Sequence, residues 1–314
     1  MGILSLILTV FTVVELNCEN MFDCQHDSLK NDTEWTVDGE NHWTFKRYWR
    51  KLNRTAQTII ACGGDGTDWM LPDLVALCEV ENDTTMRDLT QRSLLRKARY
   101  EYVMTSSPDM RGIDVALLYS PFSFRLINSH ALRIEPLPNM RPTRDILYAS
   151  GQIISGDTLH VFVVHSPSRS GGEKATQPYR MAVANRLSNA VDSIRTISPT
   201  AKIIALGDFN DYVGDAPLLE IERHDMTDIS ANATGRHGTK GTYRYRGRWE
   251  SLDHIFVSNE MAGMLTECFI LDERFLLEKD KTFGGYKPRR NYLGNHYNNG
   301  FSDHLPLVAR FKIQ

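Results

Sequence analysis

The segment Gly207-Asp208-Phe209-Asn210 places a carboxylate and a carboxamide two residues apart, directly after a run of apolar residues. That run, Lys202–Leu206, is typical of a buried strand, and Gly207 interrupts it. Asp208 and Asn210 point the same way if the extended conformation continues past the strand. A carboxylate beside an amide suits a hard cation, a phosphoryl oxygen or an attacking water, although the same residue types also form ordinary turns.

Other polar clusters lie at the ends of predicted strands. The strands are Thr9–Leu16, Pro72–Val80, Thr158–Val164 and Leu307–Lys312, and the polar groups beside them are Asn17, Glu79, His165, Asp303 and His304. A rigid sheet can hold such groups while loops complete a pocket. Because they are mainly oxygen ligands with two histidines, they favour Mg²⁺, or Mn²⁺, over a structural zinc site. Glu81 competes with Glu79, because the two share a face of the strand.

Helical and strand-like segments are interleaved over residues 9–314 without a linker or a repeat, which predicts a single domain. The predicted helices are His42–Ala61, about Thr84–Ala98, Pro178–Ile197 and Ala216–Glu222. Further predicted strands are Tyr100–Thr105, Ile113–Tyr119, Phe122–Ile134, Leu147–Ile154, Thr242–Arg246 and Ser251–Val257. Many neighbouring strands are connected like hairpins, which argues against a purely parallel sheet.

Composition limits the classes of function. The chain has 314 residues, of which 41% are hydrophobic, and a formal net charge of −3, which argues against a general polyanion-binding surface. Basic stretches occur at Lys46–Arg54, Arg244–Arg248 and Lys287–Arg290, and we expect the first to be a solvated face of a helix. The five cysteines show no paired zinc-ligand spacing, and their odd number favours a reduced state.

The N-terminal stretch Ile3–Val14 is apolar, like the core of a signal peptide. No Lys or Arg precedes it and no small-residue cleavage site follows it, and it is too short to span a bilayer as a helix. We therefore interpret Thr9–Leu16 as the first core strand and residues 1–8 as the remnant of an export signal or a disordered tail. Both a cytoplasmic and an exported location stay open. We expect a monomer without a transmembrane span.

Taken in order, the polar motifs resemble the endonuclease/exonuclease/phosphatase superfamily, whose fold is that of deoxyribonuclease I. The motifs are Asn17-Cys18-Glu19-Asn20, Glu79-Val80, His165 with the loop that follows it, Gly207-Asp208-Phe209-Asn210 and Ser302-Asp303-His304-Leu305-Pro306. The resemblance covers nearly the whole chain. It implies an α/β (α+β) fold, a four-layer sandwich in which two mainly antiparallel β-sheets pack face to face with helices outside.

The same resemblance implies metal-dependent hydrolysis of phosphate esters. It assigns Glu79 as the main ligand of a Mg²⁺ ion (or Mn²⁺), with Asn17 beside it and Asp303 near the metal. Glu79 is thereby preferred to Glu81. Apart from the resemblance, Arg169 is a candidate contact for the phosphate of the substrate, with a surface role as the alternative.

Similarity to the family further assigns a set of catalytic groups. They are His165, Asp208, Asn210, Asp253 and His304. Asp208 and Asn210 would position the attacking water and the phosphate, and Asp253 would orient His304 in a carboxylate–imidazole pair. His165 would bind the phosphate or protonate the leaving group, with Asp114 as its partner.

Several alternatives are open at this point. The substrate could be the phosphodiester of a nucleic acid, a phosphomonoester, an inositol phosphate or a lipid, because the superfamily includes all of these. Gly207-Asp208 and Gly294-Asn295-His296 also resemble pieces of the calcineurin-like metallophosphoesterases, but the Asp-x-His that opens that family is absent. A non-catalytic binding module would carry an inert residue at a catalytic position, and none is inert.

Overall fold

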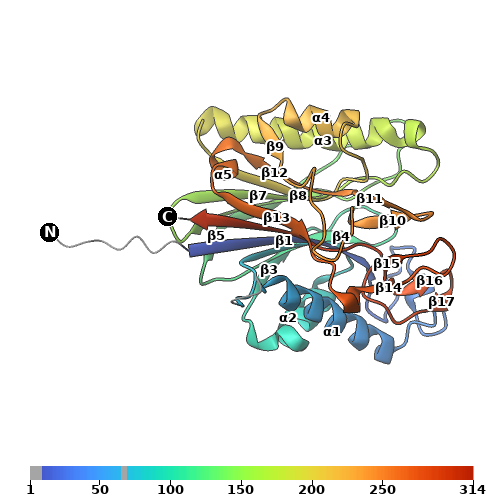
Figure 1. Ribbon diagram of the computed structural model, residues 1–314. Helices are drawn as coiled ribbons and strands as arrows, with labels where there is room; N and C mark the ends of the chain where they lie inside the picture. Colours follow the sequence, from blue (N-terminus) through green and yellow to red (C-terminus); the bar gives the residue numbers. More distant parts are fainter. Residues whose placement is uncertain (1–8, 65–68, 314) are drawn as a thin grey trace.

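Two six-stranded sheets pack face to face in the computed structural model of the chain, which describes residues 9–64 and 69–313 (Figure 1). In order across it, the first sheet contains β13 (Leu265–Ile270), β18 (Leu307–Ile313), β1 (Thr9–Met21), β2 (Leu74–Val80), β4 (Asp114–Tyr119) and β3 (Glu101–Met104). The second contains β5 (Phe124–Leu132), β6 (Ile146–Ile153), β7 (Thr158–His165), β8 (Lys202–Asp208), β12 (Asp253–Ser258) and β9 (Met226–Asp228). Only β1–β2 and β7–β8 pair in parallel within these sheets of the described chain, so the prediction of two mainly antiparallel sheets is confirmed.

Helices form the two outer layers. α1 (Phe45–Cys62) and α2 (Asp83–Gln91) cover the first sheet, and α3 (Glu173–Ile197) and α4 (Ala216–Glu222) cover the second (Figure 1). Short elements are α5 (Asn259–Ala262) and the 3₁₀ turns η1 (Thr33–Trp35), η2 (Leu94–Lys97) and η3 (Arg274–Leu276). The Asn82 side chain accepts a hydrogen bond from the amide of Thr85 and so caps α2. This arrangement is the predicted four-layer sandwich.

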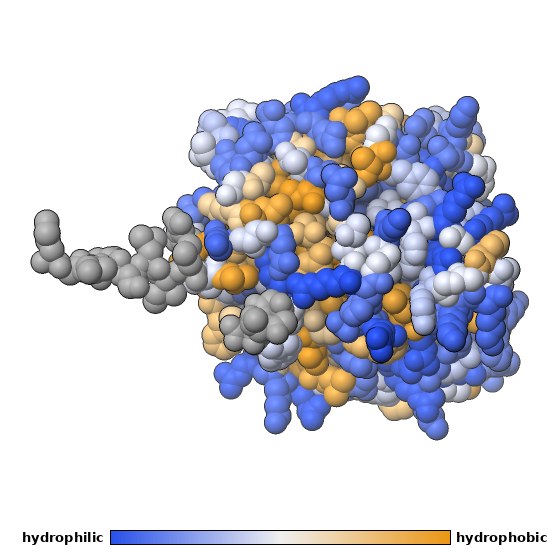
Figure 2. Space-filling view, viewed as in Figure 1, coloured by the Kyte–Doolittle hydropathy of each residue, from blue (hydrophilic) through white to orange (hydrophobic). Residues whose placement is uncertain are grey.

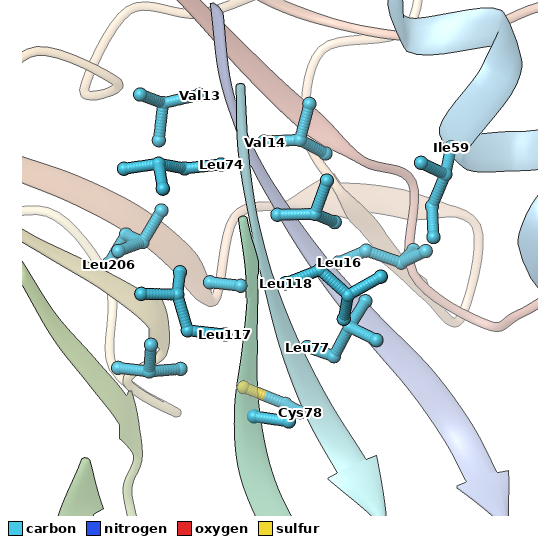
Figure 3. Close-up of a cluster of buried hydrophobic side chains, with 14 of the residues drawn as sticks. Val13, Val14, Leu16, Ile59, Leu74, Leu77, Cys78, Leu117, Leu118 and Leu206 are labelled. Carbon is cyan, nitrogen blue, oxygen red and sulfur yellow. The ribbon is translucent and has the colours of Figure 1, made fainter. Parts of the chain in front are cut away.

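The strands at the centre of the first sheet are apolar on both faces because both faces are covered. Val13 of β1 lies on the side of Leu206 from β8, between the sheets, whereas Val14 lies on the side of Ile59 from α1 (Figure 3). All four side chains are fully buried, and burial of such a side chain stabilises the fold by about 1.5–3 kcal/mol. Because residues two apart share a face of a strand, Asn17 lies on the inter-sheet side together with Val13.

The topology brings the polar strand ends to one end of the sandwich, which we call the site end. His165 lies opposite Asp208 in the β7–β8 pair, and Asp208 lies opposite Asp253 in the β8–β12 pair. In the first sheet, Asn17 lies opposite Cys78. The site end also carries three hairpins (Figure 1): β10 (Tyr243–Tyr245) with β11 (Arg248–Glu250), β14 (Leu277–Lys279) with β15 (Tyr286–Pro288), and β16 (Tyr292–Leu293) with β17 (His296–Tyr297).

Three of the elements that differ from their predicted bounds are instructive. β1 continues to Met21 instead of ending at Leu16. The predicted helix from about Thr84 to Ala98 is interrupted, because Ser93 leaves the helical path and its hydroxyl caps η2. α3 begins five residues before Pro178 and contains that proline in its second turn, although proline is most typical of the first helical position.

The expectation for residues 1–8, an export-signal remnant or disordered tail, lies outside the described residues. Among the residues that the structure does describe, none of the helices combines the length and apolar character needed to cross a membrane.

Candidate active site

A cavity of about 790 Å³ opens at the site end, and residues from both sheets line it. The predicted site residues in its lining are Asn17, Glu79, His165, Arg169, Asp208, Asn210, Asp303 and His304. Asp253 lies behind the lining, where it is fully buried. Residues separated by almost the whole chain length are thus brought to one place.

Asn17 connects the two sheets at this cavity. Its Nδ2 donates a hydrogen bond to Asp208 Oδ2 at 3.0 Å, and its Oδ1 accepts one from the Glu19 amide at 2.9 Å. The hydroxyl of Ser302 donates to the Asn17 carbonyl oxygen at 2.7 Å, so the segment before β18 is held against β1. Both the main chain and the side chain of Asn17 are therefore fixed.

Glu79 faces the cavity because the strand is irregular at this residue. Simple alternation places Glu79 on the opposite face from Cys78, whose Sγ lies 3.3 Å from the Val164 carbonyl oxygen of the second sheet. The pairing of β2 with β4 shifts register between Cys78 and Val80, and Glu79 has a left-handed backbone with φ of 62°. Such a bulge re-aims a side chain. Glu79 Oε2 consequently accepts a hydrogen bond from the Asn20 amide at 2.8 Å.

Strained backbone conformations gather around the cavity. Glu19, Asn20, Glu79 and Asn210 all have positive φ angles between 51° and 62°. A left-handed conformation in a non-glycine residue costs roughly 1–3 kcal/mol and persists only where the surroundings enforce it. Four such residues in one rim point to a site whose geometry is enforced by the rest of the fold.

His304 and Asp253 form a buried carboxylate–imidazole pair. His304 Nδ1 is hydrogen-bonded to Asp253 Oδ2 at 2.8 Å, and the Thr242 hydroxyl donates to the same carboxylate. Burial opposes a charge on His304, but the carboxylates around it, led by Asp253, outweigh burial and raise the pKa of His304 well above its usual value. With Nδ1 committed to Asp253, Nε2 is the nitrogen left for the cavity.

Asp208 and Asn210 both line the cavity, but strand alternation does not explain this. β8 ends at Asp208, and the chain turns so that Asp208 Oδ1 accepts a hydrogen bond from the Asn210 amide at 2.9 Å. Asn210 Nδ2 donates to the Ser166 carbonyl oxygen at 3.1 Å, which ties this turn to the loop after β7. Burial, reinforced by the charge of Asp253, raises the pKa of Asp208 to about 7.

His165 is a buried imidazole between two carboxylates. Its Nε2 lies 3.7 Å from Asp208 Oδ2 and 3.9 Å from Glu79 Oε1, and its Nδ1 has no hydrogen-bond partner among the described residues. Burial, with the positive charges of Arg144 and Arg111, holds the pKa of His165 well below its usual value. The ring is therefore neutral at neutral pH.

The structure corrects the expected pairing of Asp114 with His165. The Asp114 carboxylate instead accepts hydrogen bonds from the Thr105 hydroxyl at 2.5 Å and the Ser107 amide at 3.0 Å, and it does not line the cavity. Its position at the start of β4 turns it toward the loop after β3, so it holds that loop.

Arg169 and Asp303 reach the cavity with their charges already compensated. Arg169 lies over the ring of Tyr212, 4.1 Å from its centre, and forms ion pairs with Glu173 and Asp215. Asp303 Oδ2 accepts a hydrogen bond from Arg290 at 2.9 Å. Their roles with phosphate and metal stay predictions.

Lys51 was missed by the sequence analysis, which expected Lys46–Arg54 to be a solvated face. Lys51 is only 1% exposed, and its ammonium donates to the Phe301 carbonyl oxygen at 2.5 Å. It stands three residues after buried Tyr48 and four before buried Thr55 on α1, so helical spacing was the available signal. Lys51 fixes the segment that leads to His304.

Asp208, Asp253 and His304 form a buried group that could hold a divalent cation, since one ligand atom from each lies within 4.8 Å of the others. Glu79 adds a further carboxylate close to His165 and Asp208. Burial, with the negative charge of Asp253, raises the pKa of Asp208, and a bound cation would oppose both effects. An oxygen-rich site of this kind fits a hard divalent cation.

Of the rival pieces, Gly294 and Asn295 form the turn of the β16–β17 hairpin, and His296 begins β17, where it is exposed and lies outside the cavity lining. They do not meet Asp208 in a dinuclear site.

The chain matches the sequence profile of a family described as Endonuclease/Exonuclease/phosphatase family over residues 12–312. It is also similar to the solved structure of an endonuclease/exonuclease/phosphatase family protein from Bacteroides thetaiotaomicron, with 15% identity, a TM-score of 0.62, and 98% of this chain and 99% of that chain covered. The endonuclease/exonuclease/phosphatase from Bacteroides vulgatus is 14% identical, with a TM-score of 0.60, and the match covers 98% of this chain and 100% of that chain. TDP2 from D. rerio, complexed with single strand DNA product, is 15% identical, with a TM-score of 0.58, and the match covers 97% of this chain and 100% of that chain. At these identities the likeness shows the fold. No curated protein matches the sequence.

Proposed function

Because the chain belongs to the endonuclease/exonuclease/phosphatase family, a family of metal-dependent phosphoesterases, we propose that it hydrolyses phosphodiester bonds with the help of Mg²⁺ or Mn²⁺. One observation carries the proposal. The His304–Asp253 pair, the Asn17–Asp208 bridge and Glu79 meet at a single cavity.

Glu79 and Asn17 are the residues that we propose as holders of the cation, with Asp303 nearby. Their donors are oxygen atoms, as a hard cation prefers. Asp253 is less suited, because His304 and Thr242 already occupy its carboxylate. A bound cation supplies positive charge to the phosphoryl oxygens and orients the phosphate.

Asp208 is the group that we assign to accept the proton of the attacking water. A pKa of about 7 is suited to a general base at neutral pH. The hydrogen bonds from Asn17 and from the Asn210 amide hold its carboxylate in one orientation. Asn210 stands beside it in the cavity lining and positions the water and the phosphate.

The two histidines have different charges and therefore different proposed roles. His304, kept protonated by Asp253, offers Nε2–H to the negative charge that develops on the phosphoryl group. His165 is neutral and serves as a hydrogen-bond donor to a phosphate oxygen, because its lowered pKa makes it a poor source of protons.

Nucleic acid is the diester that we propose as substrate. The D. rerio relative is described in complex with single strand DNA product, and two basic stretches of this chain lie in hairpins at the site end. An inositol phosphate or lipid substrate has no comparable support from the described surface.

The test is hydrolysis of bis-p-nitrophenyl phosphate and of single-stranded and plasmid DNA, with Mg²⁺, with Mn²⁺ and with EDTA. We expect turnover that depends on the added cation. Absence of turnover of all three substrates with either cation would overturn the proposed function.

A further inference from the structure

A second cavity, of about 260 Å³, adjoins the active-site cavity. It lies between the β10–β11 and β14–β15 hairpins, and β10 contacts β15 at the site end (Figure 1). Tyr243, Tyr245 and Asp303 line both cavities. A substrate that occupies the active site can therefore extend directly into the second cavity.

The walls of the second cavity are basic in a chain that is acidic overall. The charged residues of its lining are the basic Arg244, Arg246, Lys287 and Arg290 and the acidic Asp280 and Asp303, whereas the whole chain has a net charge of −3. The end of the molecule that carries these hairpins is mostly hydrophilic in Figure 2. This end can attract a polyanion although the whole chain cannot.

The arginines of the second cavity differ in whether their guanidinium groups already have hydrogen-bond or ion-pair partners. Arg244 donates to three backbone carbonyl groups of the two hairpins, and Arg290 pairs with Glu19 and Asp303. Arg246 is exposed and forms no ion pair within the described part of the chain. Its guanidinium is the group available to a phosphate.

Aromatic rings stand beside this free arginine. Tyr245 is 49% exposed and Phe283 is 56% exposed, and both line the second cavity. Arg246 lies over the ring of Tyr245, 5.1 Å from its centre. A Cβ atom at Gly247 would lie 2.7 Å from the Cβ of Phe283, so the absence of a side chain there lets Phe283 pack against the β10–β11 turn. An exposed aromatic ring therefore lies beside the β10–β11 turn.

We propose that the second cavity is a subsite for one unpaired nucleotide of a nucleic acid substrate, next to the phosphate that is cleaved. The base stacks on Phe283, and its phosphate pairs with Arg246. Stacking requires a base whose face is open, which an unpaired strand offers and a duplex does not. An inositol phosphate has no aromatic face, so exposed aromatic rings would not serve it. The inference rests on the proposed function for its choice of substrate.

The experiment is equilibrium binding of a fluorescein-labelled oligothymidylate and of a blunt duplex, measured by fluorescence anisotropy in EDTA. The variants are Phe283→Ala and Arg246→Gln, and the matched controls are Phe122→Ala and Arg125→Gln. Phe122 is 73% exposed, and both controls follow β4 at the end opposite the site. All four side chains are exposed, so we expect each variant to keep the fold.

We expect Phe283→Ala to raise the Kd for the oligothymidylate about fivefold or more, with no change for the duplex. Arg246→Gln is expected to reduce the slope of log Kd against log salt by roughly 0.7–1, the contribution of one phosphate contact. Both controls should keep the wild-type Kd and slope.

A wild-type Kd for Phe283→Ala, or an equal weakening of the duplex, would overturn the subsite. The subsite would also be overturned if inositol hexakisphosphate displaced the oligothymidylate from wild type and from Phe283→Ala equally, but not from Arg246→Gln. That result would define a simple anion site. Binding in EDTA needs no turnover. A failure of hydrolysis and a failure of the subsite are therefore separate results.

Discussion

The Nδ2 atom of Asn17 donates a hydrogen bond to Asp208 Oδ2 across 3.0 Å, and this contact joins the two sheets at the candidate active site. Both residues are buried, with 2% and 3% of their surfaces exposed. When a buried carboxylate loses a hydrogen-bond donor, the cost of its desolvation is no longer offset. The contact therefore links the stability of the sandwich to the geometry of the site.

Replacement of Asn17 by Ala should lower the free energy of unfolding by about 1–3 kcal/mol, because Asp208 loses a buried donor. Urea unfolding followed by circular dichroism measures this change. Asn128→Ala on β5 is a suitable control, because that residue lies on an edge strand away from the site. An unchanged midpoint for Asn17→Ala would show that the bridge contributes nothing to stability.

Substitution of Asp253 by Asn should reduce kcat by at least ~10²-fold, since it removes the group that orients and charges His304. The pKa of His304 should fall, because burial lowers this pKa and the substitution removes the carboxylate that most strongly raises it. Steady-state kinetics and an NMR titration of the imidazole ring test both effects. A reduced kcat with an unchanged pKa would mean that Asp253 acts only through packing.

Glu79→Gln should raise the Mg²⁺ concentration needed for half-maximal activity by ~10-fold or more, because a ligand carboxylate is lost. Glu81→Gln is the matched control. The Glu81 carboxylate accepts a hydrogen bond from the Asp23 amide and lies outside the lining of the active-site cavity. Titration of activity with Mg²⁺ distinguishes the two, and a larger effect for Glu81→Gln would reverse the assignment.

Without a divalent cation, the protein should become less stable as the pH rises from about 5 to about 8. Burial raises the pKa of Glu81 to about 8, and burial with the charge of Asp253 raises the pKa of Asp208 to about 7. The folded state then binds protons more tightly than the unfolded state, so the stabilisation present below the unfolded pKa is lost as pH rises through the folded values.

Added Mg²⁺ should therefore raise the Tm more at about pH 8 than at about pH 5, since a cation bound to carboxylates displaces their protons. Thermal unfolding at both pH values with Mg²⁺ or EDTA tests the sign. A Tm in EDTA that increases toward pH 8 would contradict it.

Sequence patterns were sufficient for most of the long elements, although not for β13, and for the motif residues that follow regular strands. β8 shows why: its apolar run ends at Asp208, and the register then places Asp208 opposite His165 and Asp253. The expectation that Asn210 points the same way by alternation had the wrong basis, since the strand ends before it.

What the sequence could not supply were features set by tertiary contacts. The bulge that turns Glu79 into the cavity depends on the pairing of β2 with both neighbours. β14–β15 and β16–β17 contain strands of two or three residues, which are too short for a period to be visible. The partner of Asp114 was likewise decided by the path of the loop after β3.

The left-handed residues at the rim place heat resistance and turnover in competition. Glycine at Asn20 or Asn210 would relax the backbone, since glycine adopts positive φ without strain. It would also delete the Asn20 side chain that accepts from Arg111, or the Asn210 amide that reaches the Ser166 carbonyl oxygen. Selection for thermal stability and selection for catalytic rate would therefore favour different residues at these two positions.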